Sequence, residues 1–131
     1  MTPARLRQLW SSIAILLVLD VVIEAVFAGA MLSGADWARQ AHVVNAAILI
    51  ALTATAGLAA ILTLRRIPHG MKLGLALLSL AAVVFLQVAV GKWSAAGANL
   101  MWLHVPLGAA LVGFAVLAGS LASGLGGSMR E

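Results

Sequence analysis

The chain of 131 residues has no cysteine, no tyrosine, only three prolines and only 9% charged residues. The absence of cysteine excludes disulfides, thiolate metal sites, cysteine redox chemistry and the covalent attachment of a c-type haem. The shortage of charge argues against a soluble domain, in which roughly half of the residues are apolar and about a quarter are charged. Because 63% of the residues are apolar and the mean hydropathy is +1.11, we expect a lipid bilayer to surround most of the chain.

Four apolar stretches are long enough to cross a bilayer core, which takes about 20 helical residues. We place these spans at about residues 10–32, 40–64, 71–91 and 101–121. Because they use most of the chain, we expect a single transmembrane domain over residues 1–131, ending in a flexible tail at 122–131 that is rich in glycine and serine. The predicted fold is all-α, a polytopic membrane four-helix bundle.

The basic residues gather on one side of the predicted spans. Those of the richer side are Arg5, Arg7, Arg65, Arg66, Lys72 and Arg130, and those of the other side are Arg39 and Lys92. Basic residues are in excess on the cytoplasmic side of membrane proteins, so both termini and the middle loop are expected in the cytoplasm. We therefore expect a multi-pass protein of the bacterial inner membrane. Its basic residues orient it in the bilayer, and no nucleic-acid partner is expected.

The second half of the chain resembles the first. His42 and His104 are separated by 62 positions, and several other residues match at that offset. These matches include Val43 with Val105, Gly29 with Gly91, Ala56 with Ala118 and Gly57 with Gly119. An even number of spans separates the two copies, so the bundle would consist of two parallel-repeated helical hairpins. The two histidine-bearing spans would then lie across a diagonal of the bundle, with the histidines at equal depth and facing each other.

Two imidazoles at matched depth predict a haem site. A pair of neutral histidines is a normal axial ligand set for haem iron, so we expect His42 and His104 to bind one haem b between them. Ala46 and Gly108 lie one turn deeper on the same spans, where small side chains leave room for a flat ring. In the alternative interpretation, each histidine reaches the outer interface and hydrogen-bonds to water, to the backbone or to Asn99.

Further polar side chains lie at membrane depth on the first and third spans. Carboxylates are costly there and usually face a bundle interior or a cavity. We expect Glu24 either to hydrogen-bond a ligand histidine or the haem edge, or to be a protonated carboxyl bonded to Gln87 or Thr53. Gln87 would be the equivalent polar group of the second repeat, and we interpret Asp20 as structural. A zinc or copper site would need ligands besides the histidines, and only Glu24 or Asn45 would be at hand.

Two further patterns predict helix packing and depth. Small residues at spacing four form one stripe at Ala25, Gly29 and Ser33 and another at Ala47, Ala51, Thr55 and Ala59. Such stripes let a second helix approach closely in a membrane. The four tryptophans, Trp10, Trp37, Trp93 and Trp102, fall at predicted span ends and are typical of an aromatic belt at the two interfaces.

Three short motifs carry a family resemblance. They are Phe27-Ala28-Gly29, Phe85-Leu86-Gln87 and His104-Val105-Pro106-Leu107-Gly108. With these motifs the chain resembles, over nearly its whole length, a family of small bacterial four-helix membrane proteins. It is also distantly similar to one half of haem A synthase, whose halves carry haem-ligating histidines on even-numbered helices. The resemblance implies that His42 and His104 are haem ligands.

The chain also departs from the haem A synthase pattern. Halves of that enzyme carry a further histidine on an odd-numbered helix, with a glutamate nearby on the first helix. Here the first and third spans contain no histidine, and only Glu24 matches the acidic part. The resemblance therefore implies haem binding without implying synthase chemistry.

These patterns together predict a membrane protein that binds b-type haem for electron transfer or haem handling, with no enzymatic turnover of its own. Its partners would be the lipid bilayer and a redox protein or a larger membrane complex. One alternative is a cofactor-free small transporter or dimeric exporter, in which Glu24 binds a proton or cation and a homodimer partner is expected. Another is an accessory subunit that packs on a larger membrane complex through its stripes of small residues.

Overall fold

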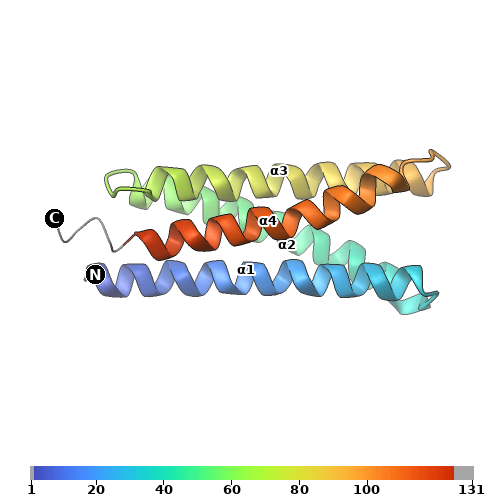
Figure 1. Ribbon diagram of the computed structural model, residues 1–131, viewed down its shortest axis with the longest axis horizontal. Coiled ribbons are helices and arrows are strands. Elements are labelled where there is room, and N and C mark those ends of the chain that lie inside the picture. Colours follow the sequence, from blue (N-terminus) through green and yellow to red (C-terminus); the bar gives the residue numbers. More distant parts are fainter. Residues whose placement is uncertain (1, 126–131) are drawn as a thin grey trace.

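The computed structural model describes residues 2–125, which form four long helices joined by short links (Figure 1). The helices are α1 (Pro3–Leu32), α2 (Asp36–Leu64), α3 (Gly70–Ala95) and α4 (Met101–Gly124). Each is long and apolar enough to cross a membrane. The predicted all-α membrane four-helix bundle is thereby confirmed.

The helices reach beyond the expected spans at several ends. α1 begins at Pro3, seven residues before the expected start, and α3 continues to Ala95. α4 ends at Gly124, so the first residues of the expected flexible tail are helical. The rest of that tail, residues 126–131, and with it Arg130, lies outside the described residues.

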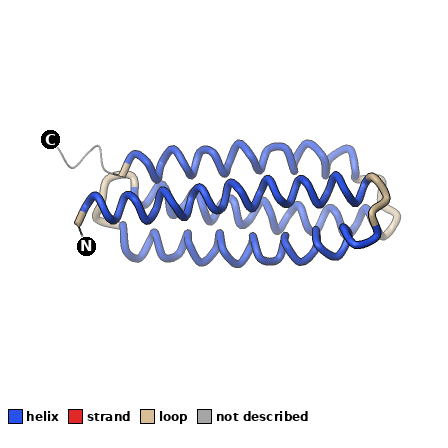
Figure 2. The backbone as a smooth tube through the Cα atoms, turned by 90° about the horizontal axis from the view of Figure 1, so that it is seen from below, coloured by secondary structure: helices blue, strands red, loops and turns tan. Residues whose placement is uncertain are grey.

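The four helices alternate in direction and close into a ring. α2 packs on α1 and α3, and α4 packs on α3 and α1, as the two views of the bundle show (Figures 1 and 2). Within residues 2–125, α2 makes no close backbone approach to α4, nor α1 to α3. The two histidine-bearing helices therefore lie across a diagonal, as expected of an up-down bundle.

Short links force consecutive helices to be antiparallel neighbours. Gly34 and Gly97 make the two turns at the end of the bundle away from the N-terminus, which we call the outer end, and we call the opposite end the inner end. Their φ angles are positive, 87° and 102°, which glycine adopts without a steric penalty. At the inner turn His69 adopts the left-handed region with φ 64° directly before Gly70. At the start of α1 the hydroxyl of Thr2 accepts a hydrogen bond from the backbone N–H of Arg5, which caps the helix.

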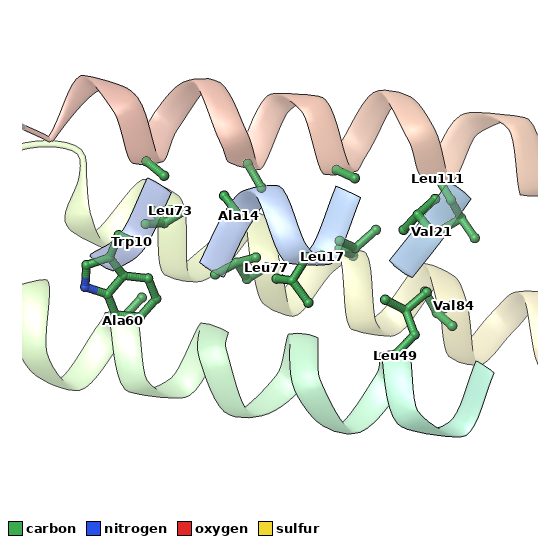
Figure 3. Packing of buried hydrophobic residues seen from close by; sticks show 14 of the residues in the cluster. Trp10, Ala14, Leu17, Val21, Leu49, Ala60, Leu73, Leu77, Val84 and Leu111 are labelled. Atoms are coloured by element: carbon green, nitrogen blue, oxygen red, sulfur yellow. The ribbon is translucent and has the colours of Figure 1, made fainter. Parts of the chain in front are cut away.

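The core fills the middle and inner part of the bundle (Figure 3). Its buried members are Trp10, Ala14, Leu17, Val21, Leu49, Ala60, Leu64, Leu73, Leu77, Leu80, Val84, Leu111, Ala115, Ala118, Ala122 and Leu125. Lipid tails are as apolar as these side chains, so close packing rather than water exclusion holds the helices together here.

The aromatic-belt prediction is wrong for Trp10. Its side chain is only 5% exposed and belongs to the core (Figure 3). Trp10 lies about two turns after the start of α1, on the helix face that packs against the core rather than the face that is exposed. Trp37, Trp93 and Trp102 are exposed near the outer helix ends, as a belt requires.

Most residues of the two predicted stripes are exposed and do not pack closely against another helix, although Ala59 is partly buried against the core. Ala25 and Gly29 are exposed, and a Cβ added to Gly29 would meet nothing within 4 Å. Ala47 and Ala51 are exposed as well. The packed face of α2 instead consists of Ala38, Ala46, Leu49, Thr53, Gly57, Ala60 and Leu64. In helices this rich in alanine and glycine, small residues recur at spacing four on several faces, so the spacing alone does not identify the contact face.

Two glycines bring α2 and α3 together. A Cβ added to Gly57 would lie 2.9 Å from the backbone nitrogen of Leu78, and one added to Gly74 would lie 3.0 Å from the carbonyl oxygen of Gly57. The two backbones thus touch where neither residue has a side chain, which is the close approach that small residues permit between membrane helices.

Replacing Gly57 with leucine should separate α2 from α3. Because the added side chain would collide with backbone atoms, we expect the free energy of unfolding in detergent to fall by about 2–3 kcal/mol. The matched control is Gly29→Leu on the open face of α1, which should leave stability within experimental error. Denaturant titration of both variants measures the difference, and equal midpoints would show that the two glycines are not a tight contact.

Candidate functional site

The two predicted ligand histidines face each other across the bundle. His42 lies about two turns into α2, and His104 lies in the first turn of α4. The ring centroids are 6.4 Å apart and the ring planes are inclined at 81°. Both residues are half-buried. The rings therefore point into the bundle.

The ring of His42 is held by a carboxylate from α1. Oε1 of Glu24 lies 3.0 Å from Nδ1 of His42, at ion-pair distance. The other carboxylate oxygen, Oε2, accepts a hydrogen bond of 3.0 Å from Nδ2 of Asn45. His42 and Asn45 are three residues apart on α2 and so share a helix face. Glu24, which is only 8% exposed, is thus clamped between two side chains of the neighbouring helix.

The two other partners expected for Glu24 bind elsewhere. Thr53 donates its hydroxyl hydrogen bond to the carbonyl of Leu49 in its own helix, at 2.6 Å. Gln87 lies on α3 and donates through Nε2 to the backbone carbonyl of His104, at 2.7 Å. Asp20 lies one turn inward from Glu24, and its Oδ2 is buried without a hydrogen-bond partner. Only the interpretation that joins Glu24 to a histidine agrees with these contacts.

His104 is held in a different way from His42. Its Nδ1, like that of His42, is buried without a hydrogen-bond partner, but among the described residues no carboxylate lies at ion-pair distance from it. The ring lies against the backbone of α3, because a Cβ added to Gly91 would be 2.9 Å from Cε1 of His104. The polar contact of Gln87 reaches the backbone of His104 and leaves the imidazole free. The two imidazoles therefore occupy equivalent positions in the two halves of the bundle, but different contacts hold them.

Two glycines leave space near the rings, Gly108 on α4 and Gly91 on α3. A Cβ added to Gly108 would lie 2.9 Å from Nε2 of Gln87, so that space holds the glutamine amide. The glycine that makes room for an imidazole is Gly91. The sequence carries a signal for it, since Gly91 repeats Gly29 at the same offset that joins His42 to His104.

Two cavities border the histidine pair and share part of their walls. The outer cavity has a volume of about 450 Å³, and Arg39 and Lys92 are among its lining residues. The deeper cavity has a volume of about 360 Å³. All six residues predicted to bind a cofactor line the deeper one: Glu24, His42, Ala46, Gln87, His104 and Gly108. Both volumes fall within the usual range of small-molecule sites, about 300–1,000 Å³.

The separation of the rings suits a single metal ion between them. Imidazole nitrogens bind metals at about 2 Å, and each nitrogen is about 1 Å from its ring centre, so one shared ion would place the centroids about 6 Å apart. The observed distance is 6.4 Å. Among the described residues no three histidine or acidic side chains group closely enough to hold a bare metal ion. A tetrapyrrole needs only two protein ligands, because it supplies the other four itself.

Comparison with known proteins finds no family model, no curated protein and no solved structure that matches this chain. The similarity to haem A synthase therefore stays an expectation from short motifs. The functional argument rests on the geometry of the two histidines and their cavities.

Proposed function

We propose that this membrane protein binds one haem b through His42 and His104 and serves electron transfer or haem handling. The observation that carries the proposal is the pair of inward-facing imidazoles, with centroids 6.4 Å apart, beside cavities of ligand size. A bis-histidine haem has no open coordination position, which favours electron transfer over oxygen or substrate chemistry. Bound haem would supply a one-electron redox centre inside the bundle.

The surrounding residues would divide the work of holding haem. Glu24 at Nδ1 of His42 would orient the imidazole and leave the opposite ring nitrogen, Nε2, available to bind iron. Gly91 leaves the space that the ring of His104 occupies, and Gln87 donates a hydrogen bond to the backbone carbonyl of His104. At the outer cavity the side chains of Arg39 and Lys92 would offer positive charge to the haem propionates.

The distribution of charged residues supports a setting for the protein. We place it in the bacterial inner membrane with both termini in the cytoplasm, because Arg5, Arg7, Arg65 and Arg66 lie at the same end of the bundle. The histidine pair then lies near the outer surface. A redox partner or a larger membrane complex would exchange electrons there, and a homodimer is compatible with the same arrangement.

An absorption spectrum of the detergent-purified protein tests the proposal. We expect a six-coordinate low-spin haem in the oxidised and the dithionite-reduced form, with about one haem per chain by pyridine haemochrome. The double variant His42→Ala/His104→Ala, expressed and purified in parallel, should be colourless. A colourless wild-type protein that also fails to take up added haem would refute the proposal.

A second candidate function rests on Glu24 alone. This buried carboxyl lines the deeper cavity and has two polar partners, an arrangement that also suits binding of a proton or cation during transport. Transport in vesicles separates the two functions. For a transporter, Glu24→Gln abolishes flux while alanine at both histidines leaves it intact.

A further inference from the structure

The deeper cavity opens through one side of the bundle. Its lining residues on α2 and α3 are buried or half-buried, whereas many of those on α1 and α4 are exposed. The exposed lining residues are Ala25, Gly29 and Leu32 on α1 and Met101, Val105, Ala109 and Val112 on α4. The cavity therefore has its mouth between α1 and α4 and its closed wall on α2 and α3.

The mouth exists only in the outer half of the bundle. Nearer the inner end, α1 and α4 contribute Ala14, Leu17, Ala115 and Ala118 to the common core. Figure 1 shows α4 running beside α1 at the end that carries the N-terminus and moving toward α3 at the opposite end. The resulting opening lies within the length of helices that span the membrane, so it faces lipid tails.

The residues around the mouth are small and apolar, and the site behind it has polar atoms to offer. A Cβ added to Gly29 would meet nothing within 4 Å, so no side chain of the described residues closes the opening there. Behind it lie the buried and unpartnered atoms Nδ1 of His104 and Oε1 of Gln87. Toward the outer surface the adjoining cavity is lined by Arg39 and Lys92. This layout suits an amphiphile with an apolar body and an anionic edge that faces outward.

We propose that haem enters and leaves the site sideways from the bilayer, through the opening between the outer halves of α1 and α4, with its carboxylates toward Arg39 and Lys92. This inference rests on the proposed function for the identity of the ligand. The lateral route itself depends only on the shape of the bundle, so it is testable without haem.

A cysteine reporter tests the route, and the cysteine-free chain makes the labelling specific. Val84 on α3 is 2% exposed and lines only the deeper cavity, on the wall opposite the mouth. In phosphatidylcholine vesicles we expect Val84→Cys to react with pyrenylmaleimide dissolved in the bilayer. Adding Gly29→Leu and Ala109→Leu, which narrow the mouth from both sides, should slow labelling at least tenfold. Adding Ala51→Leu, a single alanine-to-leucine enlargement on the exposed face of α2, should not.

Haem loading provides the second measurement. Haemin incorporated in vesicles should load the wild-type apoprotein and the Ala51→Leu control at the same rate, and the Gly29→Leu/Ala109→Leu variant at least tenfold more slowly. Equal labelling and loading rates in all three proteins would overturn the lateral route, as would a Val84→Cys that stays unlabelled. If wild-type protein takes up no haem while labelling still depends on the mouth, the haem proposal fails and the lateral route stands.

Discussion

Alanine at position 104 is expected to abolish tight haem retention. The loss of a residue that merely supports a metal ligand already weakens metal binding 10- to 100-fold, so removal of a ligand itself should weaken haem binding by at least about 100-fold. Within the described part of the chain, the ring nitrogen Nδ1 of His104 has no hydrogen-bond partner, so no adjacent side chain is in place to substitute for the lost ligand. Haem occupancy after purification, and the rate of haem transfer to a competing apoprotein, measure the effect.

Two controls separate lost ligation from lost structure. His69→Asn changes the exposed histidine of the inner link, at a position whose left-handed backbone asparagine tolerates, and should keep full haem occupancy. Free imidazole added to His104→Ala should restore a low-spin spectrum by filling the vacated space beside Gly91. Unchanged haem occupancy in His104→Ala would rule out the bis-histidine arrangement.

The exchange Glu24→Gln should leave haem bound and raise its midpoint potential. The carboxylate beside Nδ1 of His42 makes that imidazole a stronger donor and favours the more positive, ferric iron. Glutamine keeps the size of the side chain and removes the charge, so the ferrous state becomes more stable relative to the ferric state. A tenfold change in the relative affinity for the two oxidation states corresponds to about 59 mV, and a shift of this order is expected in a redox titration.

The control for the potential is Asp20→Asn. Asp20 lies one turn inward on α1, and neither of its carboxylate oxygens is in hydrogen-bond contact with a histidine, so its replacement should move the potential much less. Equal shifts in the two variants would show that Glu24 acts only as one more buried charge. An unaltered potential in Glu24→Gln would place this residue away from the iron.

Several features of the site were predictable because they depend on periodicity alone. Residues at equal positions in two parallel hairpins must stand at equal depth, which brings His42 and His104 to one level. The partners of those histidines were not predictable in the same way. Asn45 shares a helix face with His42, but only the angle at which α1 packs on α2 brings Glu24 between them.

The contact faces of the helices also depend on tertiary packing that the sequence pattern does not reveal. Ala47 and Ala51 have the spacing of a helix–helix contact, yet Ala46, the neighbour of Ala47, and Gly57, further along the helix, lie in the packed face. All these residues are small and apolar, so the sequence of α2 alone does not show which of them face another helix. The approach of the α3 backbone at Gly74 decides which face of α2 turns inward.

The sequence by itself determined the solvent, the number of spans and the diagonal placement of the two histidines. Length and hydropathy settle these features, because a bilayer accepts only helices of sufficient length and an even-span repeat preserves depth. Tertiary structure alone decided that Trp10 is buried, that Gly91 receives the ring of His104, and that α1 and α4 part in the outer half. These outcomes depend on how side chains from different helices interlock, a property that no single segment of the sequence contains.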